Sequence, residues 1–162
     1  MIFVDDGGSM TVWNYRNGRV RSLPVGTAVA IQPVGDRIAV IRADGVTLLG
    51  VRGPRVIGTA DFVDGPATHG AVSADGCWLA TTSEPGELRI WSLAEFGEAG
   101  WQPVAAMRVD GALFECAWAS AGLDLYAAGR RGMYAFTFRV PRGAPAPRTP
   151  STRRGPAIFG RR

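Results

Sequence analysis

The chain has 162 residues and a formal net charge of +4 at pH 7, from 18 basic and 14 acidic residues with one neutral histidine. This length is enough to bury a core of ordinary single-domain size. No apolar run is long enough to cross a bilayer, and the N-terminus lacks the charged leader and apolar stretch of a signal peptide. We therefore expect a cytoplasmic protein without a membrane span.

Short apolar strands separated by turns recur along the chain. In the clearest copy, residues 71–93, two strands flank the Asp75-Gly76 turn and a third strand carries Trp91. Aligning the copies on this third strand gives four anchor segments, at residues 9–14, 46–51, 88–93 and 133–138. The aligned positions Trp13, Leu49, Trp91 and Phe136 are 36, 42 and 45 residues apart. This spacing is typical of the roughly 40–45-residue, four-stranded blades of β-propellers.

Two turns separate the strands of each of the last three copies. The first turns are residues 34–36, 74–76 and 120–122, and the second turns are residues 43–45, 84–86 and 130–132. The Gly and Asp residues in them supply the conformations that tight hairpins need at low steric cost. Since no segment shows helical spacing over ten residues, the pattern predicts antiparallel meanders, with residues 92–98 as a loop between blades.

Residues 73–91 begin with a Ser, an Asp-Gly turn and a strand, and they continue as Ser-x-x-Gly-x-apolar-Arg-apolar-Trp. Residues 8–13 repeat the end of this motif, from its Gly to its Trp. In this motif the chain resembles the bacterial WD-repeat β-propellers, over roughly residues 1–140. The resemblance implies an all-β fold of four-stranded antiparallel blades. It also implies a protein–protein interaction scaffold, with no catalytic, cofactor-binding or metal-binding residues.

The chain departs from this family at two places. The family's Gly-His pair has no counterpart, because His69 lies too close to Asp75-Gly76, and the acidic turn residue is Pro85 in the third copy and Arg131 in the fourth. The His–Asp–Ser/Thr–Trp hydrogen-bond network that the resemblance implies is therefore incomplete.

The copies add up to about three and a half blades, because the first copy shows only its last two strands. A propeller normally closes with about 4–8 blades, and an open one exposes sheet faces and edges. Three explanations stay open. The chain is the C-terminal part of a larger WD-repeat protein, or it pairs with a second copy to close a ring, or it forms an open or smaller stack of sheets.

Residues 141–162 are expected to form a separate, disordered tail rich in Arg and Pro. All 14 acidic residues precede Arg139, whereas seven of the 18 basic residues lie from Arg139 onward. The tail therefore carries the positive charge, and its composition cannot bury enough apolar surface to fold. We interpret it as a solvated terminus. The alternative is an arm in which Arg153 and Arg154 bind nucleic acid or another acidic partner.

Catalytic and metal chemistry have little support in the sequence. The lone histidine, His69, is expected to hydrogen-bond at the entry to a strand, and neither cysteine has the spacing of a zinc ligand. Cys116 alternates with Phe114 and Trp118, which predicts one shared buried face and makes Cys116 a small core residue. The remaining alternative, an enzyme or ligand-binding propeller with a central-channel site, is disfavoured by apolar inner strands such as residues 27–31.

Besides Arg153 and Arg154, three residues are candidate partner contacts. Trp101 lies in a Gly-containing linker, where it either anchors a partner on the rim or caps the adjacent blade. Arg130 and Arg131 replace the acidic turn of the fourth copy and, together with Arg42, either form a basic patch for an acidic ligand or are solvated turn charges. The tryptophans that fall within the repeat are predicted to be core residues: Trp13, Trp78, Trp91 and Trp118.

Overall fold

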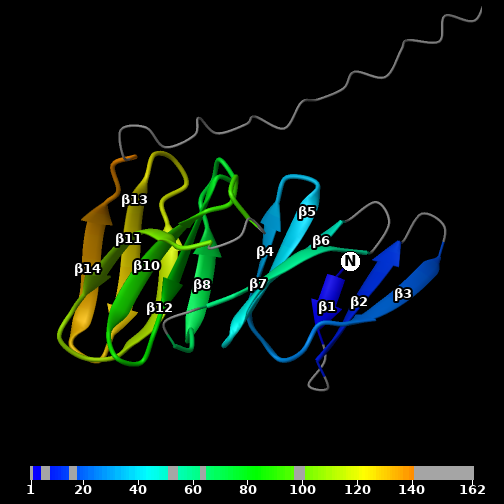
Figure 1. Ribbon diagram of the computed structural model, residues 1–162, viewed down its shortest axis with the longest axis horizontal. Helices are drawn as coiled ribbons and strands as arrows, with labels where there is room; N and C mark the ends of the chain where they lie inside the picture. The colour runs from blue at the N-terminus through cyan, green and yellow to red at the C-terminus, as the bar shows by residue number, and fades with distance from the viewer. Residues whose placement is uncertain are drawn as a thin grey trace, which may run out of the picture.

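The computed structural model describes residues 2–4, 8–14, 18–50, 55–62, 65–96 and 101–140, and these residues form fourteen strands (Figure 1). In chain order the strands are β1 (Ile2–Val4), β2 (Ser9–Asn14), β3 (Arg19–Pro24), β4 (Ala28–Val34), β5 (Arg37–Arg42), β6 (Gly45–Gly50), β7 (Val56–Asp61), β8 (His69–Val72), β9 (Trp78–Thr82), β10 (Glu87–Ser92), β11 (Pro103–Arg108), β12 (Leu113–Trp118), β13 (Asp124–Gly129) and β14 (Gly132–Thr137). The described residues contain no helix, so none of their segments is a helix able to cross a membrane. The predicted all-β class is confirmed, whereas the expected tail at residues 141–162 lies outside the described residues.

The strands form four antiparallel sheets that follow one another along the chain. The second sheet, β4-β5-β6-β7, and the third, β8-β9-β10-β11, have four strands, and the first, β1-β2-β3, and the last, β12-β13-β14, have three. Within each sheet the strands pair in the order in which they follow one another along the chain, so each sheet is a meander, as the two turns per copy predicted.

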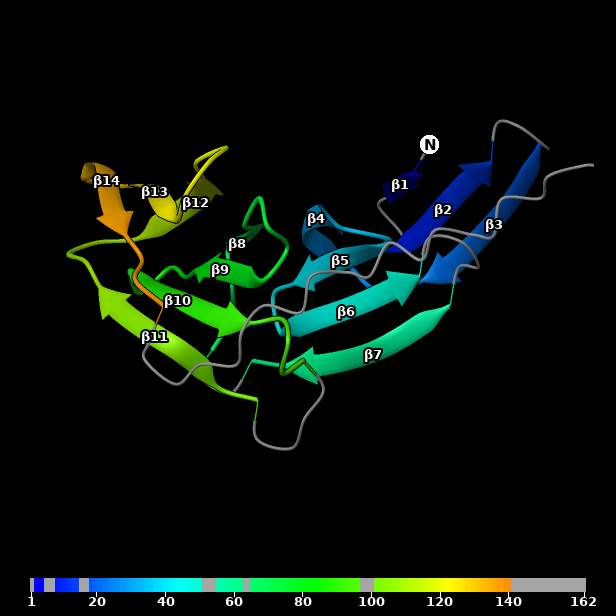
Figure 2. The same cartoon turned by 90° about the horizontal axis from the view of Figure 1, so that it is seen from above.

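The four sheets stand side by side in an open arc (Figure 2). The strands β4, β8 and β12 lie on its inner side, where β8 contacts both of the others, and β7 and β11 lie on the outer side. The first and last sheets are at opposite ends of the arc in both Figure 1 and Figure 2. Among the described residues, the first sheet has no counterpart of the inner strand of the complete sheets, and the last sheet has no counterpart of their outer strand.

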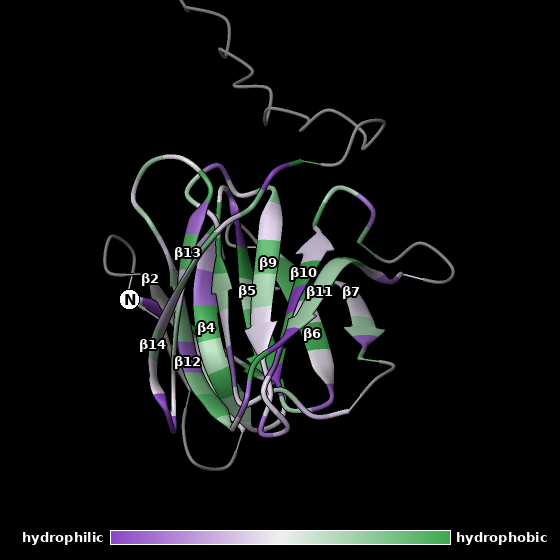
Figure 3. Cartoon of the chain, turned by 90° about the vertical axis from the view of Figure 1, so that its left-hand side faces the viewer, coloured by the Kyte–Doolittle hydropathy of each residue, from purple (hydrophilic) through white to green (hydrophobic). Residues whose placement is uncertain are grey.

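A sheet inside the arc packs on two neighbouring sheets, one on each of its faces. We call the face toward the next sheet in chain order the forward face, and the opposite one the backward face. Because successive side chains of a strand point to opposite faces, β6 places Leu48 in the forward core and Leu49 in the backward core. β9 is likewise buried on both faces, since Leu79 joins the backward core and Ala80 the forward core, and Figure 3 colours this strand green in its middle and paler toward its ends.

Three clusters of buried side chains fill the spaces between the sheets. The first joins Met10 to Ile38, Val40 and Leu49, the second joins Ile41 and Leu48 to Trp91 and Trp101, and the third joins Leu88 and Ile90 to Cys116, Leu125 and Phe138. Trp78, Trp91 and Cys116 are buried, as predicted. The side chain of Trp13 lies outside the described residues.

The outer strands complete the four-stranded blades that the resemblance implied. The two turns per copy located only three strands, and β3, β7 and β11 follow the anchor strands β2, β6 and β10 as a further, outer strand. In consequence the first copy has three strands rather than two. An outer strand such as β7 is largely exposed, so its sequence lacks the apolar alternation of a covered strand.

The prediction for Phe114 was wrong. The pairing of β12 with β13 shifts register between Leu113 and Glu115, a β-bulge that breaks the alternation of side chains. Cys116 consequently points into the core while Phe114 is 52% exposed. Trp118 remains half-buried, with its Nε1–H donating to the Ala71 carbonyl at 3.0 Å.

Candidate interaction site

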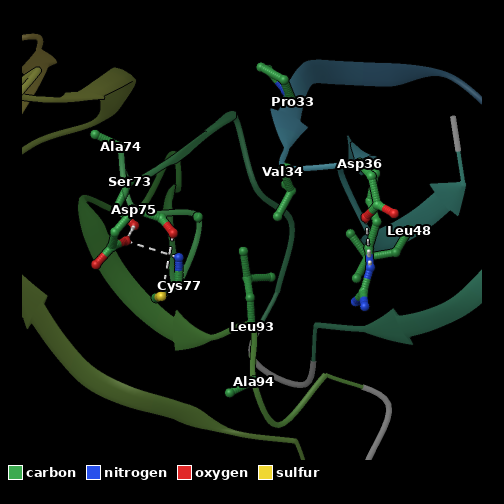
Figure 4. Close-up of a pocket in the computed structure, with 13 residues that line it drawn as sticks. Pro33, Val34, Asp36, Leu48, Ser73, Ala74, Asp75, Cys77, Leu93 and Ala94 are labelled. Atoms are coloured by element: carbon green, nitrogen blue, oxygen red, sulfur yellow. Dashed lines mark hydrogen bonds and ion pairs between the residues drawn. The ribbon is translucent and has the colours of Figure 1, made fainter. Parts of the chain in front are cut away.

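A groove of about 500 Å³ opens on the rim between the second and third sheets (Figure 4). Two turns that recur at the same place in the repeat form its walls, the β4–β5 turn and the β8–β9 turn. The lining consists of Pro33, Val34, Gly35, Asp36, Arg37, Leu48, Ser73, Ala74, Asp75, Gly76, Cys77, Leu93 and Ala94. The sequence predicted both turns, but not the groove, which requires the two sheets to be placed side by side.

Hydrogen bonds within the β8–β9 turn hold its shape. The Ser73 hydroxyl and the Cys77 N–H both donate to Asp75 Oδ1, at 2.5 and 2.9 Å. The Trp78 N–H donates in turn to Ser73 Oγ at 3.0 Å. Gly76 takes a φ of +71°, which a residue with a Cβ adopts only at a cost. The wall is therefore organised before any partner arrives.

The Cys77 thiol in this groove is poorly suited to nucleophilic chemistry. Its desolvation raises the pKa, and the neighbouring Asp75 carboxylate raises it further through its charge and a hydrogen bond. A pKa above the ordinary value keeps the thiol protonated at neutral pH, and the thiol is a much weaker nucleophile than the thiolate.

The groove combines apolar surface with an excess of negative charge. Val34, Leu48 and Leu93 supply apolar lining, and the charged residues are Asp36, Arg37 and Asp75. Arg37 and Asp36 are 3.9 Å apart and both are exposed, so their mutual stabilisation is small. Two carboxylates against one guanidinium favour a partner segment that carries a cation.

The structure places Arg130 and Arg131 on the β13–β14 turn, exposed to solvent. Arg131 forms an ion pair with Asp110 at 3.0 Å. The third arginine of the expected basic patch, Arg42, contacts Asp44 at 2.9 Å and Asp61 at 3.7 Å. Carboxylates therefore offset the charge of Arg42 and Arg131. Arg153 and Arg154 lie outside the described residues.

Trp101 is placed in the core between the second and third sheets, not on the rim surface. It is 7% exposed, and its ring centroid lies 4.7 Å from that of Trp91 and 5.2 Å from that of Phe96. Its Nε1–H donates to the Ser92 carbonyl at 2.8 Å. These contacts correspond to the second of the two roles considered for Trp101, packing against the adjacent blade.

Trp101→Phe should lower the free energy of unfolding by about 1–2 kcal/mol, because the phenyl ring still contacts Trp91 but the Ser92 carbonyl loses its donor. Urea denaturation measures this change in the free energy of unfolding. Trp118→Phe is the matched comparison, since that indole also donates to a carbonyl, that of Ala71, from a less buried position. Unchanged stability of Trp101→Phe would contradict a stabilising contribution of the hydrogen bond to the Ser92 carbonyl.

His69 links two inner strands. The Cys116 N–H donates to His69 Nδ1 at 3.3 Å, which joins β8 of the third sheet to β12 of the last. A backbone contact of this kind occupies the nitrogen that a general base would use. Within the described residues, His, Cys, Asp and Glu do not gather into a group of three or more that could hold a metal ion.

The chain was compared with protein families, curated proteins and solved structures. No family profile and no curated protein matches it. Many solved structures are similar in fold, among them two WD40 or β-propeller domains. The C-terminal WD40 domain of Sif2 has a TM-score of 0.65 at 18% identity, over 83% of this chain and 44% of that chain. The Cps50 (Swd1) β-propeller domain of Myceliophteria thermophila has a TM-score of 0.67 at 14% identity, over 85% and 49%.

A chain of the mitotic checkpoint complex has a TM-score of 0.64 at 15% identity, over 80% of this chain and 41% of that chain. This chain thus spans less than half the length of each of these three structures. Identities this low show the fold alone. The described residues therefore share the fold of part of a β-propeller, over an arc of four sheets.

Proposed function

We propose that the chain is a non-catalytic protein–protein interaction scaffold whose rim groove binds an extended segment of a partner. The fold supports this, because it is that of WD40 propellers, whose rigid blades carry interaction surfaces in turns and loops. The roles of His69 and Cys77 also support it, since a backbone contact occupies His69 Nδ1 and a raised pKa keeps the Cys77 thiol protonated.

The groove is the observation that carries the proposal. Its walls are pre-formed turns, and its lining joins apolar side chains to the carboxylates of Asp36 and Asp75. A pre-formed site avoids the entropy cost of ordering a loop upon binding. A peptide with one apolar and one basic side chain matches this lining in both shape and charge.

Panning a random peptide library displayed on phage against the full chain tests this function. We expect enrichment of peptides that contain Arg or Lys. Their binding should be lost with Ala94→Trp, which fills the groove from an exposed position, and should weaken about tenfold with Asp36→Asn, which removes one charge. Ala121→Trp is the matched control, because Ala121 is exposed on the same rim outside the groove.

Two results of the panning would contradict the groove assignment. One is that no peptide sequence is enriched. The other is that the enriched peptides bind Ala94→Trp as well as they bind Ala121→Trp.

The other expected contacts are also part of the proposal. Residues 1–140 would form the propeller unit and residues 141–162 a disordered tail rich in Arg and Pro. Arg130 would be the accessible member of the turn pair, since Arg131 contacts Asp110, and it would act with Arg153 and Arg154 on an acidic partner. The open arc would be completed by further blades, which either a longer protein or a second copy supplies.

A further inference from the structure

The last sheet exposes an apolar face. Its forward face has no described segment packed on it, and the register places the cross-strand pairs Ala117–Tyr126, Tyr126–Ala135 and Ala128–Met133 on this face. Met133 is 77% exposed and Tyr126 is 41% exposed. An exposed cluster of apolar side chains marks an interaction surface.

The same positions are buried wherever another sheet follows. Met133 is the second residue of its strand, and the second residues of the equivalent strands are Met10 in β2, Val46 in β6 and Leu88 in β10. All three are 0% exposed. Met133 is therefore an apolar side chain like those that fill the core at this position in the other three sheets. Of the four equivalent positions, it is the exposed one.

The first sheet carries an exposed backward face that is complementary to the forward face of the last sheet. Inside the arc, a forward face is always covered by the backward face of the next sheet, and the first sheet has a backward face with no preceding sheet among the described residues. Since Leu23 packs forward with Met10, the alternating positions Val20 and Ser22 on β3 lie on the backward face. Both are exposed.

We propose that a second copy of this chain packs the backward face of its first sheet on the forward face of the last sheet, and that the reverse contact closes a ring of two chains. Length supports this occupant, because the chain matches 41% to 49% of the solved propeller chains, so two copies supply about one whole propeller. Two copies bring eight sheets, within the 4–8 blades that propellers contain.

Such a contact is heterologous, since it joins two different surfaces, and it closes only if the rotation between copies completes the circle. The arc offers two different surfaces, because its two ends carry opposite faces. The ring rests on the proposed function, since it specifies that a second copy completes the open arc, but it does not involve the rim groove. The Met133 and Ala94 variants therefore test the two proposals separately.

Sedimentation velocity of the full chain over a wide concentration range tests the ring. The wild type should be a discrete dimer. Met133→Lys should weaken dimerisation at least about a hundredfold, because each of the two contacts would bury one lysine. Val20→Lys with Ser22→Lys should weaken it similarly from the other side. Ile57→Lys, at another exposed apolar position, 44% exposed on the outer strand β7, should leave the dimer intact.

Three results would overturn the proposal. A folded, monomeric wild type would mean that a different sheet covers this face. A dimer that survives Met133→Lys would place the contact elsewhere, for instance on the edge of β14. Dissociation by Met133→Lys but not by the Val20 and Ser22 double variant would mean that two last sheets meet face to face. All these positions are exposed, so circular dichroism should show native β-structure in every variant.

Discussion

Trp91→Ala is expected to lower the free energy of unfolding by about 3–5 kcal/mol, the range for truncating a large buried aromatic residue. The side chain is fully buried between the second and third sheets, where it contacts the rings of Phe62 and Trp101. The change removes apolar contact on both sheets and leaves a cavity between them. Urea denaturation monitored by circular dichroism measures the loss, which is a large part of the stability of a typical domain.

A smaller change separates the hydrogen bond of Trp91 from its packing. The indole Nε1–H donates to Thr81 Oγ1 at 3.0 Å, and both groups are buried. Trp91→Phe leaves the Thr81 hydroxyl without this donor, so adding Thr81→Val should recover part of the lost stability. If Trp91→Ala were nearly neutral, the inter-sheet position of this residue would be contradicted.

Gly86→Ala is expected to lower the free energy of unfolding by about 2–4 kcal/mol, because two separate costs add. Gly86 has a φ of +87°, which costs energy for any residue with a Cβ. A Cβ there would also lie 2.6 Å from the carbonyl oxygen of Val109 and would meet that of Gly111. The segment that joins the third sheet to the last would have to move, since the Val109 N–H donates to the Gly86 carbonyl at 2.9 Å.

Gly122→Ala is the matched control for the steric part. Gly122 has a φ of +77°, but a Cβ there would have no atom within 4 Å. We therefore expect only the backbone cost, about 1–2 kcal/mol. Thermal denaturation of the two variants side by side measures the difference. Equal losses would mean that the 109–111 segment does not press against Gly86.

The tryptophans show where sequence reasoning reaches its limit. Trp78 and Trp91 fall within strands of the repeat, so their burial follows from the register and was predicted. Trp101 precedes an outer strand that the pattern did not reveal, and its two expected roles could not be separated. Packing on Trp91 and Phe96 decides between them, and those contacts form only after β10 and β11 are paired.

The charged residues show the same limit. Arg131 and Arg42 suggested a basic patch, because the sequence shows only that both follow the second strand of a copy. The structure brings Asp110 to Arg131 and Asp61 to Arg42 from neighbouring segments. Charge neutralisation between segments distant along the chain depends on their spatial placement, which a local pattern does not contain.

The sequence by itself determined the three inner strands of each full copy, the turns between them and the spacing of the repeat, because alternation and glycine turns are local properties of the chain. Only the tertiary structure decided which face of each strand is covered, as the bulge at Phe114 and the exposed Met133 show. The physical reason is that burial depends on the neighbouring sheet. Val46, Leu88 and Met133 occupy the same place in their strands, but in the described part of the chain only the first two have a sheet packed on them.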